Sequence, residues 1–297
     1  MTTISSDQVS AKVRDTFNFS VDKFPLSGPD GMSTPWYALF RSDTSNVVGN
    51  GSVTDRYVPH TTDDVCALVD AAGEAFDGNI DVKCHFRDGH YVDIKPTSAD
   101  RLKVYGERDN VWPRVILQAG YDGKAFRATM GYYRDACANL AMMSRVNGTS
   151  VSIRHTSGLR GHMDSLISTF NTLKDGWKSL TDVITNLQSR DVQMVDFLNA
   201  IYPQPAEDAS KRAATVHRER TESIVRRLQR ENFATGRPSI GDDFKVSAWQ
   251  AYNAVQGFVQ HDAQSKTGFK SDFDRILRAS RDANVKQAER LALGLAA

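Results

Sequence analysis

Histidine, cysteine and paired carboxylates could support catalysis or metal binding, but their spacing in this sequence favours neither. The seven histidines never stand four residues apart on an expected helix, as a zinc-binding pair would. The three cysteines form no Cys-x-x-Cys pair and are odd in number, which argues against a zinc site or a disulfide framework. Asp242-Asp243 has no spaced third carboxylate and indicates a loop or helix cap. We therefore expect no catalytic residue and no metal, and a protein that is not an enzyme.

A histidine pair and glycine-rich motifs could also indicate metal binding, nucleotide binding or catalysis. His85 and His90 flank an expected hairpin turn and could approach each other across it, although cross-strand neighbours of this kind are usually incidental. The chain contains no GxxxxGK[ST] loop, no GxGxxG after a strand and no GxSxG elbow. We therefore expect no nucleotide cofactor, and no cofactor of any other kind.

The near-neutral charge of the chain conceals a strong segregation along it. The 297 residues carry 37 Lys/Arg and 36 Asp/Glu, a formal net charge of +1. Residues 1–100 hold 8 basic and 15 acidic side chains, net −7, whereas residues 101–160 hold 10 and 4, net +6. Residues 211–230 hold 7 and 2, net +5. Two basic segments therefore stand out, and a solvated surface or a polyanionic partner would each account for them.

The first basic segment alternates cations with aromatic residues, the combination that single-strand binding requires. Cations neutralise phosphates, and aromatic faces stack on unpaired bases. The candidate DNA contacts are Lys124, Arg127, Tyr132, Tyr133, Arg134, Arg145, Arg154, His155, Arg160, Arg226 and Arg227. Aromatic residues at strand spacing are often buried, so we expect Phe126 and one of the two tyrosines to lie in the core. The basic residues of 211–230 spread around a helix, which favours solvation or loose phosphate contacts.

The elements that must position these residues change character near residue 158. Before it, we expect strands at 36–41, 46–49 and 56–59, a helix at 61–76, hairpins at 79–95 and 114–132, a helix at 133–145 and a strand at 150–155. After it, we expect helices at about 160–190, 191–202, 206–232, 247–261 and 272–293. The sequence thus predicts an α+β fold, with an antiparallel-hairpin sheet and helices in the N-terminal half and an all-helical C-terminal half. The expected domains are 1–158 and 159–297.

The most regular pattern in the helical half is a heptad seam. Its members are Met163, Leu166, Phe170, Leu173, Trp177, Leu180, Ile184 and Leu187. Such a narrow apolar stripe needs a partner helix. We favour an intramolecular helical hairpin over an intersubunit coiled coil, because Gly176 weakens an isolated helix.

Several blocks of the sequence resemble one protein family. The blocks are 36–43 with 48–49 and 55–59, 121–123 with 134–140, 153–156, and 248–255 with 259–261. Together they resemble the phage/plasmid-like family of unknown function numbered 932. Where that family often shows Asp-His, this chain has Gln260-His261, which weakens a catalytic role for the pair. The strand-rich half followed by a helix is more distantly similar to the ring-forming single-strand annealing proteins Redβ, RecT and the Rad type.

These resemblances imply a function and a setting. We expect an ATP-independent, phage-type protein that binds and anneals single-stranded DNA and assembles into homo-oligomeric rings or filaments. The alternative is a protein-binding or structural assembly module of a phage or plasmid without DNA activity; a metal-dependent nuclease using Asp242 and Asp243 ranks below both. No apolar run reaches 18 residues and the N-terminus lacks a signal-peptide pattern, so we expect no membrane partner and a location in the bacterial host cytoplasm.

Overall fold

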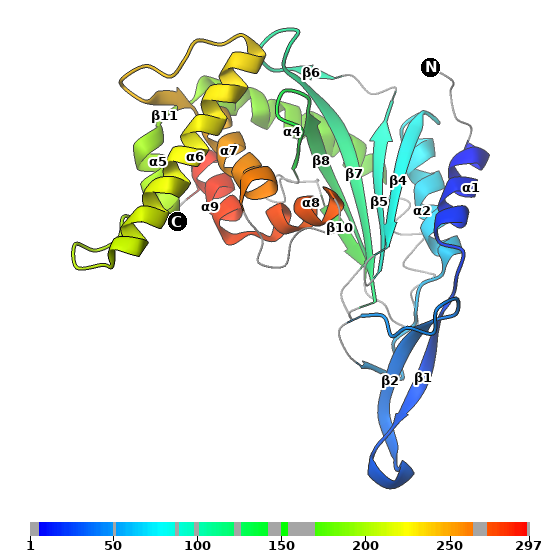
Figure 1. Ribbon diagram of the computed structural model, residues 1–297. Helices are drawn as coiled ribbons and strands as arrows, with labels where there is room; N and C mark the ends of the chain where they lie inside the picture. Colours follow the sequence, from blue (N-terminus) through cyan, green and yellow to red (C-terminus); the bar gives the residue numbers. More distant parts are fainter. Residues whose placement is uncertain are drawn as a thin grey trace. The chain divides into compact units, whose positions relative to one another are not determined.

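Helices and antiparallel sheets make up the protein, which confirms the α+β class (Figure 1). The computed structural model describes residues 6–49, 52–86, 89–97, 101–121, 126–141, 150–153, 170–263 and 272–295. Two compact units share the chain. Unit 1 comprises residues 1–100, 113–130 and 147–177, and unit 2 comprises residues 101–112, 131–146 and 178–297. The expected domain boundary near residue 158 lies outside the described residues.

Unit 1 begins with a helix that the sequence patterns did not reveal, α1 (Ser6–Thr16). It packs against α2 (Thr62–Ala75) and against strand β4. α2 confirms the expected helix, and its N-cap is Thr61. The Thr61 hydroxyl accepts a hydrogen bond from the Asp64 backbone N–H, and the Asp64 carboxylate accepts one from the Thr61 N–H. This reciprocal pair fixes where the helix starts.

The large sheet contains the two expected hairpins. Its strands are β4 (Ile80–Phe86), β5 (Gly89–Pro96), β6 (Leu102–Lys103), β7 (Asn110–Gly120), β8 (Phe126–Arg134), β9 (Asn139–Ala141) and β10 (Ser150–Ile153). The order is β10-β8-β7-β5-β4, with β6 also paired to β7 and β9 to β8. Gly89 stands opposite Gly120, where an added Cβ would collide with the backbone of Ala119 and Gly120. This close approach explains the glycine at the start of β5.

A long hairpin, called the arm below, extends from the core of unit 1 (Figure 1). It consists of β1 (Val21–Ser27), the short η1 (Pro29–Gly31) and β2 (Ser33–Arg41), with β3 (Val53–Thr54) paired to the base of β2. Val21 and Leu39 anchor it in a buried cluster with Val48, Val53, Tyr57 and Tyr121. The sequence predicted β2 but not β1. The expected strands at 46–49 and 56–59 reduce to a single bridge at Val47 and to turn and coil.

Unit 2 is built around a short helix that is buried on every side. The C-terminal elements are α4 (Phe170–Ser189), β11 (Asp191–Gln193), α5 (Met194–Ile201), α6 (Lys211–Thr235), β12 (Lys245–Ser247), α7 (Ala248–Gly257), the π-helical η2 (Phe258–Asp262), α8 (Asp272–Arg281) and α9 (Ala283–Ala292). All ten residues of α7 are buried, and α7 packs on α6 and α9. Asp282 caps α9, so the expected helix at 272–293 is two helices.

Most of the described heptad seam is buried within the single chain. Phe170, Leu173, Leu180, Ile184 and Leu187 are inaccessible to solvent, as the intramolecular interpretation predicts, whereas Trp177 is half-buried. Met163 and Leu166 lie outside the described residues. Among the residues described, no helix is both long enough and apolar enough to cross a membrane.

One expected element is wrong over its described residues. The patterns predicted a helix at 133–145, but β8 continues through Arg134, a turn follows at 135–138, and the chain returns as β9. Tyr133 pairs with Leu140 and Arg134 with Asn139. Ala138 adopts a φ of 53°, which closes the turn and cannot continue a helix.

Candidate nucleic-acid interface

Arg134, a predicted phosphate contact, lies inside unit 2. Its side chain is 1% exposed. Its Nε and Nη2 donate to the two carboxylate oxygens of Asp109, each at 2.8 Å, and its Nη1 donates to Glu231 Oε2 at 2.8 Å. A bidentate pair of this kind is a strong charge-assisted contact, and breaking it would leave carboxylates buried without a cation. Arg134 therefore belongs to the interior and not to an exposed DNA surface.

Arg227, a second predicted contact, completes the same buried network. Its Nη1 donates to Asp262 Oδ2 at 2.9 Å and its Nε lies 3.3 Å from Glu231 Oε1. Its Nη2 donates to the backbone carbonyl of Cys137 at 3.3 Å. Glu231 thus lies between two guanidinium groups. The positive charge of Arg134 and Arg227, which the sequence count assigned to DNA, is neutralised here by Asp109, Glu231 and Asp262.

Tyr132 is also buried, which excludes base stacking by this ring. Its hydroxyl donates to Asn253 Oδ1 at 3.2 Å, and its ring lies 5.1 Å from the Trp249 ring between centroids. Asn139 Nδ2 donates to the Asn253 carbonyl at 3.2 Å. The expectation that Phe126 and one of the two tyrosines are buried is confirmed, because Phe126 and Tyr132 are inaccessible while Tyr133 is half-buried.

The other predicted DNA contacts are either exposed or lie outside the residues that the structure describes. Arg127 is exposed on β8 in unit 1, where it stands opposite Ser152. Arg226 is exposed on α6 in unit 2 and lies 3.4 Å from Glu222. The residues outside the description are Lys124, Arg145, Arg154, His155 and Arg160. Of the predicted contacts, the structure therefore brings together Tyr132, Arg134 and Arg227, in the core.

The cysteines and acidic pair behave as structural groups. Burial raises the pKa of the Cys137 thiol to about 12 and that of Cys84 to about 11, so both stay protonated and weakly reactive. Asp242 and Asp243 lie on an exposed loop. Across the residues described, no group of three or more His, Cys, Asp or Glu side chains could hold a metal ion.

A histidine pair lies in the core of unit 1. His60 Nε2 and His90 Nδ1 are 2.7 Å apart, and the Tyr121 ring stacks on His60 at 4.2 Å. Burial, with a smaller effect from the Arg41 charge, lowers the pKa of His90 to about 3. Neutral His90 is therefore a packing residue. His85 and His90, which the sequence allowed to approach across the hairpin, are not cross-strand partners, because His90 stands opposite Phe86 and His85 opposite Tyr91.

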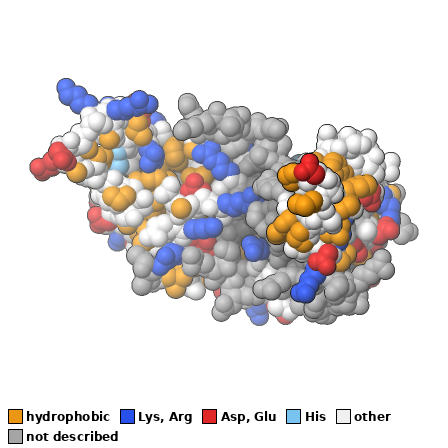
Figure 2. Space-filling view, turned by 90° about the horizontal axis from the view of Figure 1, so that it is seen from below, with side chains coloured by type: hydrophobic (Ala, Val, Ile, Leu, Met, Phe, Trp, Pro, Cys, Tyr) orange, Lys and Arg blue, Asp and Glu red, His pale blue; other side chains and the backbone are white. Residues whose placement is uncertain are grey.

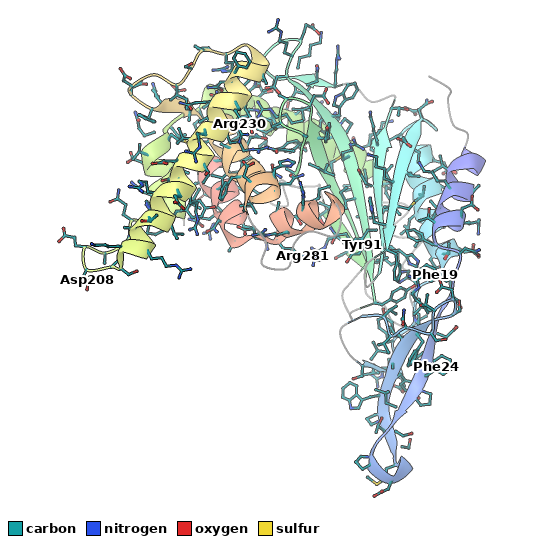
Figure 3. All side chains as sticks on the ribbon, in the orientation of Figure 1. Phe19, Phe24, Tyr91, Asp208, Arg230 and Arg281 are labelled. Atoms are coloured by element: carbon teal, nitrogen blue, oxygen red, sulfur yellow. The ribbon has the colours of Figure 1, made fainter. Side chains whose placement is uncertain are left out.

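Sequence reasoning missed an exposed aromatic group at the end of α6. Phe233 is 87% exposed, although it is a large apolar side chain. Arg226, Arg230 and Phe233 are spaced by four and three residues, which places them on one helix face. Gly236 ends the helix in the left-handed conformation, with a φ of 73°, and Arg237 follows directly. Figure 3 marks Arg230 on this helix.

A second aromatic side chain and two more cations lie beside the helix end. The guanidinium of Arg237 lies over the Tyr105 ring, 3.8 Å from its centroid. Burial raises the pKa of Tyr105, whose hydroxyl is also 2.7 Å from Ser247 Oγ. Arg108 approaches the same turn, with Nη1 3.6 Å from the position that a Cβ on Gly236 would occupy. We call Phe233, Arg230, Arg237, Arg108 and Tyr105 the Phe233 platform.

Two cations of the platform, Arg230 and Arg108, are exposed, and Arg237 is half-buried. Arg230 lies 3.5 Å from Asp262, which also binds Arg227 at 2.9 Å. Because Asp262 keeps Arg227 and contacts of an exposed guanidinium contribute only about 0–1 kcal/mol, a phosphate could take the place of Asp262 at Arg230 at small cost. The helix was expected to end at residue 232, which put Phe233 just outside it. The 4,3 spacing and the Gly236 cap were the signals that could have placed it on the basic face.

The interior of unit 2 also explains the sequence blocks described above. Arg134, Cys137 and Asn139 of one block meet Trp249 and Asn253 of another in the buried core. A family model, described as Domain of unknown function (DUF932), matches residues 50–292. Comparisons with curated proteins and with solved structures find no match. Since the match covers most of the sequence and includes the blocks that build this core, the chain belongs to the DUF932 family.

Proposed function

We propose that the protein binds single-stranded DNA without ATP, at the Phe233 platform. The observation that supports this most directly is the 87% exposure of Phe233 next to Arg230 and Arg237. The exposed phenyl face can stack on a planar ligand, and the cations beside it favour an anionic partner. A single strand offers both an unpaired base to stack and a phosphate to neutralise.

The chemistry of the platform favours single strands over duplexes. A stacking ring can reach a base face only where the base is unpaired. Arginines on phosphates position a strand but do not read its sequence, so binding should tolerate many sequences. The unit that carries the platform is also the basic one: unit 2 has 23 Lys/Arg and 18 Asp/Glu, net +5, whereas unit 1 has 14 Lys/Arg and 18 Asp/Glu, net −4. The annealing activity and homo-oligomeric assembly expected from the sequence belong to this proposal.

The test is anisotropy of a labelled oligonucleotide titrated with the protein. We expect Phe233→Ala to weaken binding by about 1–3 kcal/mol, five- to 150-fold, because stacking on one base is lost. Phe233→Trp should bind at least as well as the wild type. Phe233→Leu should bind as weakly as the alanine variant, because it keeps an apolar surface but has no aromatic face.

A salt titration tests the phosphate contacts separately. The affinity should fall with rising salt, and Arg230→Ala should reduce the slope of log K against log salt by about 0.7, one phosphate contact. Val216→Ala, another exposed apolar position on α6, is the matched control and should bind like the wild type. A wild-type protein without salt-dependent affinity for oligonucleotides, or a Phe233→Ala variant that binds normally, would overturn the proposal.

A second function, a protein-binding or assembly module without DNA activity, is favoured by the exposed apolar arm of unit 1. Light scattering with and without oligonucleotide separates the two. The module predicts an assembly that is indifferent to DNA. The DNA-binding function predicts a change of mass on adding DNA, and the annealing activity predicts faster pairing of complementary labelled strands in the absence of ATP.

A further inference from the structure

The arm of unit 1 exposes large apolar side chains along one face and at its tip. Phe24 is 53% exposed, Trp36 47% and Met32 66%, and Leu26 is exposed as well. Side chains alternate between the two faces of a strand, and Phe24 pairs with Ala38, which puts Trp36 on the same face as Phe24. The pairing register shifts between Pro25 and Ser27, at Leu26. Figure 2, the view from below, shows hydrophobic side chains gathered at the end of the arm. Figure 3 labels Phe24 on the arm.

An apolar ribbon of this kind is costly to leave in water. The base of the arm is fixed in the core of unit 1 by Val21 and Leu39, whereas Phe24, Met32 and Trp36 lie beyond that core. A two-stranded ribbon has too little buried surface of its own to account for such side chains. Contiguous exposed apolar surface normally marks an interaction site.

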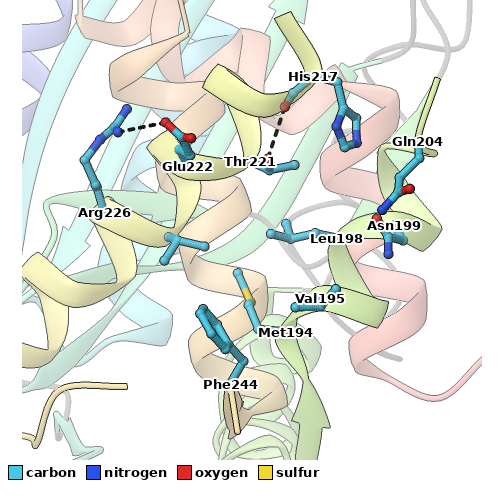
Figure 4. Close-up of a pocket in the computed structure, with 11 residues that line it drawn as sticks. Met194, Val195, Leu198, Asn199, Gln204, His217, Thr221, Glu222, Arg226 and Phe244 are labelled. Atoms are coloured by element: carbon cyan, nitrogen blue, oxygen red, sulfur yellow. Dashed lines mark hydrogen bonds and ion pairs between the residues drawn. The ribbon is translucent and has the colours of Figure 1, made fainter. Parts of the chain in front are cut away.

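Unit 2 contains a groove with the matching character. A cavity of about 390 Å³ opens between α5 and α6, and its floor and walls include Met194, Val195, Leu198, Val225 and Phe244 (Figure 4). Val195 and Phe244 are exposed there. The volume is within the range of about 300–1,000 Å³ typical of pockets that hold a ligand, and is large enough for an aromatic side chain. Polar groups, among them His217, Glu222 and Arg226, stand at its rim.

The charges of the two surfaces are also complementary. Between Phe24 and Trp36 the arm carries a single charged residue, Asp30, at the tip. The groove is bordered by α6, where the basic residues Lys211, Arg212, Arg218, Arg226 and Arg230 are exposed against the acidic residues Glu219 and Glu222, and Arg226 and Glu222 line the groove itself. An apolar ribbon with an acidic tip therefore fits an apolar groove beside a basic helix.

We propose that the arm of one copy of this chain docks into the α5–α6 groove of a second copy. The two surfaces are different, so each copy offers one arm and one groove, and the contact repeats head to tail. Such heterologous contacts close into rings or continue as filaments. This contact gives the homo-oligomeric assembly of the proposed function its interface. It does not depend on DNA binding, because it uses neither Phe233 nor Arg230.

The experiment is a mixing test by light scattering after size exclusion. The arm variant carries Met32→Ser and Trp36→Ser, and the groove variant carries Val195→Asp; all three positions are exposed, so folding should be retained and is checked by circular dichroism. We expect the wild type to assemble with rising concentration. Each variant alone should stay monomeric. An equimolar mixture should give a species of two chains and nothing larger, because one intact arm meets one intact groove.

Controls and contrary outcomes are equally specific. Val47→Ser removes an exposed apolar group of unit 1 outside the arm and should leave assembly unchanged. A wild type that is monomeric at every concentration, as docking into the same chain or a foreign partner would give, overturns the proposal. So does a wild-type assembly that survives in both variants. Phe233→Ala should still assemble, and the arm variant should still bind oligonucleotide, so failure of one proposal is distinguishable from failure of the other.

Discussion

His90 illustrates how a single side chain couples the core of unit 1 to pH. Its ring lies 4.3 Å from Phe17 and 5.3 Å from Phe86 between centroids, and its Nδ1 contacts His60. The site holds a neutral imidazole and disfavours an imidazolium, because burial removes water and Arg41 adds a like charge.

We expect unit 1 to lose stability as the pH falls from about 6.5 toward 3. The pKa of His90 is lowered to about 3 in the folded protein, whereas an unfolded histidine has a pKa of about 6.5. Between these values the unfolded chain binds the extra proton, so the free energy of unfolding falls by up to about 1.4 kcal/mol for each pH unit. Urea unfolding at pH 7.5 and at pH 5.5 measures this change in the free energy of unfolding.

The matched variant is His90→Phe, which keeps an aromatic ring among aromatic neighbours but cannot be protonated. Its unfolding free energy should change less between the two pH values than that of the wild type, whatever its absolute stability. Equal pH dependence in the two proteins would show that His90 is not the titrating group.

Single residues also show what sequence patterns can and cannot predict. The helix at 61–76 was predicted because its signals are local, and the cap that starts it joins a hydroxyl and a carboxylate only three residues apart, Thr61 and Asp64. Arg134 was assigned to DNA because its partners, Asp109 and Glu231, are 25 and 97 residues away. No local pattern contains that information, so a count of charges along the chain overstates the exposed positive charge.

At the scale of elements, α6 and α7 show two kinds of helix start. The Ser210 hydroxyl accepts a hydrogen bond from the Ala213 N–H at an exposed end of α6. The Ser247 hydroxyl accepts one from the Gln250 N–H, is 2.7 Å from the Tyr105 hydroxyl, and is buried. The Gln250 side chain returns a contact to the Ser247 N–H at 3.0 Å.

We expect Ser247→Ala to cost more stability than Ser210→Ala. The buried substitution leaves the Gln250 N–H and the Tyr105 hydroxyl without their partner, so the loss should approach about 2 kcal/mol, whereas water can replace the exposed cap at about 0.5–1 kcal/mol. Urea midpoints of the two variants test the difference. Equal losses would contradict the buried cap as the cause.

Elements with a clear period were predicted well, and those defined by tertiary contacts were not. The hairpins at β4–β5 and β7–β8 and the helices α2, α5 and α6 follow from local spacing. The helix expected at 133–145 does not exist over its described residues, because pairing of Tyr133 with Leu140 overrides the local preference. Of the two strands of the arm, β2 was predicted and β1 was not, because β1 gains its strand geometry from pairing with β2.

At the scale of the whole chain, each unit is assembled from several segments. Unit 2 draws on residues 101–112 and 131–146 as well as 178–297, and the chain crosses between units within β7, β8 and α4. The sequence showed a change of period near residue 158 but could not show this exchange, because periodicity reports local conformation and not which segments pack together.

We expect a fragment of residues 159–297 not to fold on its own. It would lack Arg134 and Tyr132, leaving Glu231 with Arg227 as its remaining cation and Trp249 without the Tyr132 ring. Circular dichroism under a urea gradient should show no cooperative transition. A fragment of residues 101–297, which contains every segment of unit 2, is the comparison and should unfold more cooperatively. Cooperative unfolding of the shorter fragment would contradict the inference that unit 2 needs residues 101–112 and 131–146 to fold.

The burial of Arg134, Asn139, Trp249 and Asn253 has a consequence for how relatives of this protein are compared. These positions lie within residues 50–292, which the family model matches, and they face one another inside unit 2. Because they build a folded interior, a match to the family model indicates a shared architecture and not, by that fact, a shared activity. We expect members that share the activity proposed here to carry an aromatic residue at the position of Phe233 and arginines beside it, on the exposed face of α6.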